Sequence, residues 1–560
     1  MLQRSVMRML SAILVSAFLL SSCTTAGGKV TEETEVTGTS GSTEIAKTEE
    51  TPASESIQSK ADFTDEEKAI AEHYNDYAND VDDRLVPCDE GDPAALELKA
   101  IPGVKLVARK SFFEDKEYLV FFDEPLDHKD PSKGTFTQTV YVYYEGKDAP
   151  NCFLIDGYEI GSYVMSDLRE DFDTKMPLKI RDDILGEYSI GSDSNFILPE
   201  YRLYGTSQPD NLTKDDLEFW GFMNCEQAAE DFHDIIEAFK DSFTGKWCIE
   251  GLSKGGEATV YQLAKHPEDG DLFLGMAAMV LMDKGHMGLY KYAYTTAGDL
   301  VYGKEKAKKI RDLITEFQIE CLKNRDKLTT LIWSRSSSSY RFSPDLDKEI
   351  LFDCMVLDQV YYWQYLRDDH LDKIKEAMSL KDAATHEDKE MYITRLCDAL
   401  EAGYSGVQYA LPTKTKGLQE IDLYSFLFQC YHEDGHFGYD FSYLRKAIKK
   451  SGSKAKLYVT KDMEDDIWDL RIDPSHRDLF SYDPSVLEAR KSAIDNPDKP
   501  LILINGLTDI FNTCELTESD RSNIFIFNLP KSSHIDSFPG NLDAEQRLKF
   551  DEIVKKYMTN

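Results

Sequence analysis

Basic residues and cysteine motifs are both scarce in this 560-residue sequence. Lys and Arg together number 64 against 102 Asp and Glu, which gives a formal net charge of −38. A surface this acidic repels phosphate groups, so we expect no nucleic acid partner. None of the ten cysteines belongs to a C-x-x-C pair, which excludes a zinc ribbon and a thioredoxin-like motif. No repeat of fixed period is evident, and we expect neither a resident metal ion nor a cofactor.

The N-terminus lacks an apolar run long enough to cross a bilayer. Residues 9–20 are apolar and follow Arg4 and Arg8, but about a dozen residues fall short of the roughly 20 that a spanning helix needs. The pattern is typical of a secretory signal peptide. The sequence L-S-S-C at 20–23 resembles the lipobox of bacterial lipoproteins. We therefore expect residues 1–23 to be a lipoprotein signal, with lipidation at Cys23 anchoring the protein outside the cytoplasm on the bacterial cell membrane.

Large apolar side chains are nearly absent from residues 24–62, which are rich in Thr, Glu, Ser and Gly. Such a segment buries too little surface to offset its ordering entropy, so we expect a disordered tether. Beyond Cys23, nine cysteines remain, an odd number. Disulfides are permitted outside the cytoplasm, but the spacing leaves their pairing open, as the composition leaves the oligomeric state.

Strand-like and helix-like segments alternate after the tether. Runs rich in aromatic and β-branched residues predict strands. Apolar residues at helical spacing predict a helix over 224–239, and a Gly-rich turn leads into another over about 257–265. This alternation indicates a parallel sheet with helices packed on it. The strands predicted in this part are residues 118–122, 136–144, 151–155, 195–199 and 246–250.

A change of character divides this α/β pattern. Residues 290–454 are helix-rich, charged and poor in strand-like runs, and strands return at 501–504 and 524–527. We interpret the chain as one α/β core interrupted by a helical cap. The first part of the core is expected over 63–289 and the second over 455–560.

The turn at 251–256 reads G-L-S-K-G-G and stands between a predicted strand and a predicted helix. It fits the G-x-S-x-G pattern of the α/β-hydrolase fold, in which a serine is raised on a strained turn that only small neighbours permit. The sequence therefore predicts an α/β-hydrolase core with Ser253 as the nucleophile. The backbone N–H groups of Lys254 and of Tyr158 are the expected oxyanion donors.

A serine nucleophile needs a base that is itself held by a carboxylate. In α/β-hydrolases these residues follow the serine along the chain in the order acid, then histidine. Asp509 lies in the loop after the predicted strand at 501–504, and His534 in the loop after the strand at 524–527. We predict a triad of Ser253, Asp509 and His534.

Several segments around the predicted nucleophile share a recognisable pattern. The G-L-S-K-G-G turn is the most specific, and it is accompanied by E-P-L-D-H at 124–128, G-T-F-T-Q at 134–138, L-I-D-G-Y at 154–158, P-E-Y-R-L-Y-G-T-S at 199–207 and E-Q-A-A-E-D-F at 226–232. Over about residues 100–540 the chain resembles the secreted bacterial tripeptidyl aminopeptidases of the PS-10 type. These are relatives of the lysosomal prolyl carboxypeptidase and dipeptidyl peptidase group. The resemblance implies a serine exopeptidase that releases short peptides, typically tripeptides, from a free N-terminus, and it leaves dipeptide release open.

Two positions depart from that family's pattern. Tyr201 stands where the family has His. At the acid loop the family's Gly-x-x-Asp-Pro-Trp becomes G-L-T-D-I-F at 506–511, so Asp509 survives while the following Pro and Trp are replaced. The second departure bears on substrate preference rather than on the triad.

The end of the helical cap supplies a candidate for substrate recognition. The sequence F-Q-C-Y-H-E at 428–433 resembles the family's Tyr-Gln-x-x-Thr-Glu segment. An aminopeptidase must recognise a substrate ammonium group, and a carboxylate forms a strong charge-assisted hydrogen bond with one. We therefore predict Glu433 as the anchor of the substrate's amine.

The same region offers a competing motif. H-E-D-G-H at 432–436 fits H-E-x-x-H, which on a helix places two imidazoles on one face to bind zinc, with the glutamate as general base. Tyr439 and Ser442 stand where the longer metzincin pattern has Gly and His, and the glycines of this segment weaken a helix. A zinc metallopeptidase, an esterase that uses the same triad and an inactive peptide-binding lipoprotein are the alternatives to the serine exopeptidase.

Overall fold

The computed structural model describes most of the chain after the predicted tether. The described residues are 62–75, 84–161, 184–186, 189–209, 212–213, 216–335, 340–342, 348–382, 384–403, 410–412, 418–435, 438–465, 467, 477–495 and 497–559. Cys23, the predicted signal and all but the last residue of the predicted tether lie outside the described residues.

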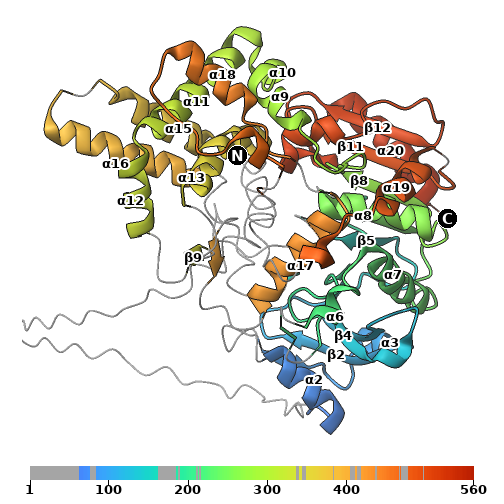
Figure 1. The fold of residues 1–560 in the computed structure, drawn as a ribbon. Helices are drawn as coiled ribbons and strands as arrows, with labels where there is room; N and C mark the ends of the chain where they lie inside the picture. Colours follow the sequence, from blue (N-terminus) through green and yellow to red (C-terminus); the bar gives the residue numbers. More distant parts are fainter. Residues whose placement is uncertain are drawn as a thin grey trace, which may run out of the picture.

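A ten-stranded mixed sheet forms the core, with strand order β1-β2-β3-β4-β6-β5-β7-β8-β11-β12 (Figure 1). Neighbours from β1 to β6 pair antiparallel, and all neighbours from β6 to β12 pair parallel. The strands are β1 (Leu85–Pro87), β2 (Val104–Lys110), β3 (Glu117–Pro125), β4 (Thr135–Tyr143), β5 (Asn151–Ile155), β6 (Asn195–Pro199), β7 (Trp247–Leu252), β8 (Leu272–Met276), β11 (Leu501–Gly506) and β12 (Ile524–Leu529).

Both faces of the parallel part are covered, which is why its strands read as continuous apolar runs. Every residue of β5, β6, β8 and β11 is buried. Side chains alternate between the two faces: Phe153 of β5 joins the apolar cluster that includes α7, and Leu154 joins the cluster that includes α20. The flanking helices are α2 (Asp65–Asn75), α3 (Pro93–Lys99), α6 (Leu217–Trp220), α7 (Cys225–Phe239), α8 (Lys254–Lys265), α19 (Ser485–Asp495) and α20 (Ala544–Met558).

A largely helical segment connects β8 to β11 and gathers to one side of the sheet (Figure 1). Its elements are α9 (Gly288–Thr295), α10 (Asp299–Tyr302), α11 (Lys304–Lys323), α12 (Arg325–Arg335), α13 (Lys348–Leu357), α14 (Tyr362–Tyr365), α15 (Asp368–Ser379), α16 (His386–Ala402), α17 (Leu418–His432), α18 (Ser442–Ser451) and the paired strands β9 (Tyr340–Phe342) and β10 (Ala410–Pro412). The division placed between 289 and 290 falls inside α9, and the predicted bounds of core and cap stay a prediction.

Short 3-10 helices complete the connections. They are η3 (Pro131–Lys133), η5 (Asp358–Tyr361), η7 (Lys461–Met463), η9 (Arg477–Phe480), η10 (Ile510–Cys514), η11 (His534–Asp536) and η12 (Pro539–Asn541). Within the described part of the chain, none of the helices has the length and apolar character that crossing a membrane requires. The nine described cysteines are free thiols.

The predicted strands and the helix at 224–239 are confirmed to within a few residues. The helix after the Gly-rich turn begins earlier than predicted, at Lys254 rather than near residue 257. In the sequence, Gly255 and Gly256 indicated a turn, but both lie in the first turn of α8. This turn packs directly against the neighbouring strands and leaves no room for larger side chains. A Cβ atom on Gly255 would stand 1.8 Å from the carbonyl oxygen of Ile155. Glycine is therefore required here by the close approach of the helix to β5.

The strand order identifies the fold as an α/β-hydrolase, the predicted fold class. Strand β4 pairs antiparallel with β6, the parallel pair β6–β5 follows it in the sheet order, and a sharp turn joins β7 to α8 at Ser253. Asp509 follows β11 and His534 follows β12, at the same edge of the sheet.

Strand β7 carries a buried carboxyl group. Glu250 of β7 is 1% exposed and accepts a hydrogen bond from the hydroxyl of Ser189 at 2.8 Å. Burial raises the pKa of Glu250 from its ordinary 4.5 to about 8. Between pH 4.5 and about 8, Glu250 is therefore protonated in the folded protein and ionised in the unfolded chain.

This burial predicts that stability falls as pH rises from about 4.5 to 8. The stabilising contribution is fully present below the unfolded pKa and is lost through the folded pKa, and it is on the order of 5 kcal/mol. Glu250→Gln should flatten this dependence in urea unfolding between pH 5 and 8, because an amide does not ionise. Glu237→Gln, on the exposed side of α7, is the matched control and should leave the slope unchanged. A wild-type slope in the Glu250 variant would contradict the prediction.

Candidate active site

Ser253 occupies a strained backbone position between β7 and α8. Its φ is 57° and its ψ −120°, a conformation that L-residues rarely adopt. Such strain costs about 1–3 kcal/mol and is maintained only when the surroundings impose it. Here the N–H of Ser253 donates to the carbonyl of Met276 at 2.8 Å, and a Cβ on Gly251 would stand 2.2 Å from the carbonyl oxygen of Gly255. The small neighbours in the motif thus make the turn possible.

The structure brings Ser253, His534 and Asp509 into one hydrogen-bonded chain. His534 Nε2 lies 2.8 Å from Ser253 Oγ, and His534 Nδ1 contacts Asp509 Oδ2. Asp509 Oδ1 also accepts the N–H of Phe511 at 2.9 Å. All three side chains are nearly inaccessible, with at most 4% exposure. With Asp509 on Nδ1, the imidazole holds its proton there and presents Nε2 to the serine as an acceptor.

Phe511, which replaces the family's Trp, keeps an aromatic ring beside the imidazole. The ring centroids of Phe511 and His534 are 5.5 Å apart, and Phe511 also contacts Tyr361 of η5 at 6.3 Å. The replacement of Trp by Phe511 therefore makes the aromatic ring beside His534 smaller but does not remove it.

The two expected oxyanion donors lie on elements that meet at the nucleophile. Lys254 is the first residue of α8, so its N–H is one of the groups left unbonded at a helix N-terminus. Gly157, with φ of +93°, turns the chain after β5, and a Cβ there would lie 3.2 Å from the N atom of Gly255. The carbonyl of Gly157 accepts from Lys254 Nζ. Because a trans peptide directs C=O and N–H oppositely, the Tyr158 N–H points away from that ammonium.

Sequence reasoning missed the role of the Lys254 side chain. Its ammonium lies over the rings of Tyr158, Tyr201 and Tyr204, at 4.7, 4.1 and 4.8 Å from their centroids. Burial lowers the pKa of Lys254 to about 8. Tyr201, which departs from the family's His, is one wall of this cage. The tyrosines at 158, 201 and 204 were visible in the sequence, but their convergence on one cation depends on the sheet.

Glu433 is buried, with 2% exposure, and contacts the N-terminus of α7. Its two carboxylate oxygens accept from the backbone N–H and, at 2.9 Å, from the thiol of Cys225. Burial raises the pKa of Glu433 to about 7, and the nearby Lys254 opposes this shift. Glu433, Lys254, Cys225 and Tyr201 line one small cavity. The predicted amine anchor thus lies beside the turn that carries Ser253, and it also has partners within the protein.

The H-E-x-x-H segment does not continue as a helix. α17 ends at His432, and Gly435 has a φ of +70°, so the backbone leaves the helical path between them. His432 Nδ1 lies 2.6 Å from the carbonyl oxygen of Ser481, and His436 lies outside the described residues. The helical spacing on which the zinc interpretation depends is therefore missing.

Glu124, His128 and Asp231 form another cluster of possible metal ligands among the described residues. Its geometry is that of a hydrogen-bonded ion network. Arg202 donates two bonds to Asp231, at 2.7 and 2.6 Å, and His128 Nε2 lies 2.7 Å from the same carboxylate. These contacts occupy Asp231 and connect the segments after β3 and after β6 to α7.

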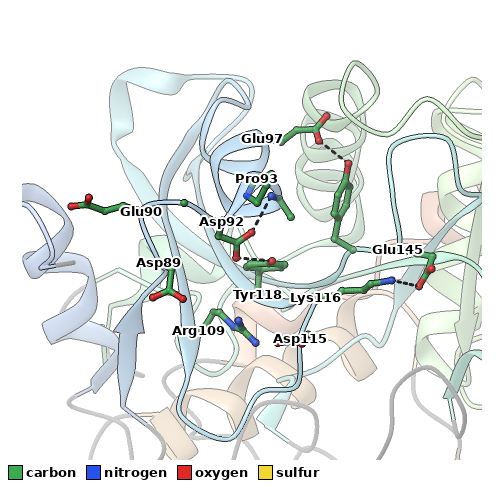
Figure 2. Close-up of a pocket in the computed structure, with 13 residues that line it drawn as sticks. Asp89, Glu90, Asp92, Pro93, Glu97, Arg109, Asp115, Lys116, Tyr118 and Glu145 are labelled. Atoms are coloured by element: carbon green, nitrogen blue, oxygen red, sulfur yellow. Dashed lines mark hydrogen bonds and ion pairs between the residues drawn. The ribbon is translucent and has the colours of Figure 1, made fainter. Parts of the chain in front are cut away.

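A further open pocket lies at the antiparallel edge of the sheet, away from Ser253. Its volume is about 890 Å³. Figure 2 shows acidic side chains around it from the β1–α3 connection, α3, the β2–β3 connection and the segment after β4. Many of its polar groups are paired: Tyr118 donates to Asp92 at 2.8 Å, and Lys116 lies 3.0 Å from Glu145. It holds no nucleophile beside a base.

Residues 92–391 match the family model described as PS-10 peptidase S37. The matched range covers more than half of the chain and includes β7, Ser253 and α8. The chain belongs to the PS-10 peptidase S37 family. The resemblance inferred from the sequence motifs is thereby confirmed, and this family membership classes the chain with the serine peptidases.

Among curated proteins, this S37 family member is similar to a prolyl tri/tetrapeptidyl aminopeptidase from Streptomyces mobaraensis. The two are 26% identical over 269 residues, which is 47% of this chain and 49% of the relative. The chain thus matches about half the length of that relative.

Solved structures similar to this S37 family member include α/β-hydrolases. A serine hydrolase from Cycloclasticus zankles is 11% identical, with a TM-score of 0.30 over 78% of this chain and 96% of the other. An alpha/beta hydrolase fold protein from Nakamurella multipartita is 12% identical, with a TM-score of 0.27 over 76% and 96%. At scores this low the fold assignment depends on the strand order above.

Proposed function

We propose that the protein is a serine exopeptidase that releases short peptides, most simply tripeptides, from the free N-terminus of oligopeptides. The hydrogen-bonded chain from Ser253 through His534 to Asp509, on the strained turn after β7, is the observation that carries the proposal. Membership of the S37 family supports peptide bonds as the substrate. The relative from S. mobaraensis, by its name a tri/tetrapeptidyl aminopeptidase, supports the exopeptidase mode.

The proposed mechanism assigns one step to each group. Ser253 Oγ attacks the scissile carbonyl carbon while His534 Nε2 takes the hydroxyl proton. The N–H groups of Lys254 and Tyr158 stabilise the oxyanion of the tetrahedral intermediate. His534 then gives its proton to the leaving amine, which leaves the N-terminal peptide as an acyl ester on Ser253. Water, activated by the same imidazole, releases that peptide, and Asp509 stays ionised throughout.

A mass-spectrometric assay tests the proposal. Oligopeptides with a free N-terminus should yield tripeptides, while N-acetylated copies of the same peptides should remain uncleaved. Rapid cleavage of the acetylated copies would contradict the exopeptidase proposal and favour an endopeptidase or an esterase. Loss of cleavage on adding a chelator, with none on adding a serine-directed phosphonate, would favour a zinc enzyme instead.

Glu433 is proposed as the amine anchor, and the expected effect of its loss is selective. A charge-assisted hydrogen bond in a desolvated site contributes roughly 1.5–3 kcal/mol, so Glu433→Gln should lower kcat/KM on unblocked peptides about 10- to 100-fold. Small acyl esters carry no ammonium group and should lose much less. Stopped assays measure kcat/KM on peptide and on ester, and the ratio of the two losses shows whether Glu433 acts on the ammonium group.

The contacts of Glu433 supply the competing explanation. Gln at 433 also weakens the contact with the N-terminus of α7, where a carboxylate stabilises the helix. A purely structural role predicts equal losses on peptide and ester, together with a lower melting temperature. Glu226→Gln, in the first turn of the same helix, is the matched control for the helix effect alone.

We further propose that lipidated Cys23 holds the enzyme on the outer side of the cell membrane, where peptides are its partners. Cys23→Ser should move the protein from the membrane fraction to the soluble fraction, because a stable anchor needs the acyl chains. Fractionation followed by immunoblotting measures this. A membrane-bound, unlipidated Cys23→Ser protein would contradict the proposed anchor.

A further inference from the structure

Glu515 is a buried carboxyl group directly behind the candidate triad. It follows η10, the short helix that begins just after Asp509, and it is 5% exposed. Among the described residues, neither of its carboxyl oxygens has a hydrogen-bond donor. One oxygen of Glu515, one oxygen of Asp509 and one ring nitrogen of His534 all lie within 4.8 Å of one another. A buried acid therefore faces the acid and the base of the site without a donor of its own.

The partners of the two carboxyl groups decide which one is ionised. Asp509 receives the N–H of Phe511 and contacts Nδ1 of His534, so its negative charge is stabilised. Neither carboxyl oxygen of Glu515 receives a hydrogen bond of this kind from the described residues. Two carboxylates that share a buried site cannot both be charged without strong repulsion. Burial and the charge of Asp509 accordingly raise the pKa of Glu515 well above its usual range.

A protonated Glu515 gains what the carboxylate lacks, an O–H group to donate. The carboxylate of Asp509 is the acceptor within reach. We infer that Glu515 is a neutral carboxylic acid that donates its O–H to Asp509, and that it acts as a positioning residue for the acid of the triad. The inference rests on the proposed roles of Ser253, His534 and Asp509. The proton of Glu515 stays in place while the proton of Ser253 moves to His534, so no net charge is added behind the imidazole.

Two consequences follow for catalysis. The hydrogen bond gives the Asp509 carboxylate a further donor beside the N–H of Phe511, and the fixed carboxylate holds the imidazole in line with Ser253. It also keeps a second negative charge away from His534. Ionised Glu515 would stabilise the imidazolium form, so His534 would hold its proton more tightly and give it less readily to the leaving amine.

The surroundings of Glu515 limit what else can titrate there. Asp509 and His534 face it from the loops after β11 and β12, and the neighbouring Cys514 thiol has a raised pKa, mainly through burial. Arg490 and Glu257 act on that thiol from α19 and α8. Both ring nitrogens of His534 already contact Asp509 and Ser253, so the imidazole has no free nitrogen for a metal ion.

Two substitutions separate the donor from the charge. Glu515→Gln keeps an N–H donor of similar shape but cannot ionise, whereas Glu515→Leu removes the donor. Both are assayed in the full chain from pH 5 to 10 with a free tripeptide p-nitroanilide and with a small acyl ester. We expect Glu515→Leu to lower kcat about 10- to 100-fold on both substrates, as the loss of a hydrogen bond to a charged group predicts. Glu515→Gln should recover most of this loss and should lack the decline that ionisation of Glu515 causes in the wild type at high pH.

Infrared spectroscopy reports the proton directly and does not depend on turnover. The difference spectrum between wild type and Glu515→Gln at neutral pH should show the carbonyl band of a neutral carboxylic acid, because protonated Glu250 contributes equally to both proteins and cancels. Absence of that band, or equal losses of kcat in the two folded variants, would overturn the inference. The proposed function fails by a different result, namely an active Ser253→Ala protein, which leaves the infrared band of Glu515 unaffected.

Discussion

Replacing Ser253 by Ala should abolish peptide hydrolysis, with a loss of roughly 10⁴- to 10⁶-fold in kcat. The hydroxyl is the group that forms the acyl-enzyme, and the N–H groups proposed for the oxyanion can supply only the small remainder. Steady-state assays on an unblocked tripeptide substrate measure the loss. Substantial turnover by the purified variant would remove Ser253 from the mechanism.

The fold should survive this substitution. Ala keeps the Cβ atom, so the strained backbone at φ 57° is changed little, and the melting temperature should stay close to that of the wild type. Ser132→Ala, on the exposed helix η3, is a matched control that should leave kcat unchanged. Circular dichroism accompanies the assay to show that Ser253→Ala is folded, because only then can the loss of kcat be assigned to the missing hydroxyl.

Removing the imidazole of His534 should have the second largest effect. His534→Ala and Asp509→Asn should each lower kcat by roughly 10⁴-fold or more, because both disable the base that activates the serine. The double variant should be only slightly slower than His534→Ala, since residues that act as one unit lose their effects together. Multiplying losses would mean that the two residues act independently.

His432→Ala is the matched control for the histidine substitution. His432 ends α17 and contacts the carbonyl of Ser481, not the hydroxyl of Ser253. Its loss should therefore leave turnover within a few-fold of the wild type. Activity that survives in His534→Ala and disappears in His432→Ala would reverse the assignment of the base.

Local patterns in the sequence were enough to predict the sheet and the order of its key residues. The apolar runs at 151–155, 195–199 and 501–504 have the continuous character that burial on both faces requires, and the structure has strands there. The Gly-rich turn predicted the elbow because steric crowding at a strained serine restricts its neighbours. Strand ends then directed attention to Asp509 and His534.

Contacts between distant segments could not be predicted in this way. Glu515 looks like an ordinary loop acid in the sequence. The short helix η10 places it near Asp509, and only the pairing of β11 with β12 brings His534 to both acids. Likewise the ammonium of Lys254 meets tyrosines from two separate segments. Both are long-range arrangements of single polar side chains, which leave no periodic signal.

The most direct test of the central claim is intact-mass spectrometry after treatment with a fluorophosphonate. The account predicts one adduct per chain, mapped by peptide sequencing to Ser253, formed in step with loss of peptidase activity and slowed by an unblocked tripeptide substrate. The adduct should be missing in Ser253→Ala and in His534→Ala, which lacks the activating base. Full inactivation without an adduct at Ser253, or an adduct at Ser253 with peptidase activity unchanged, would contradict it.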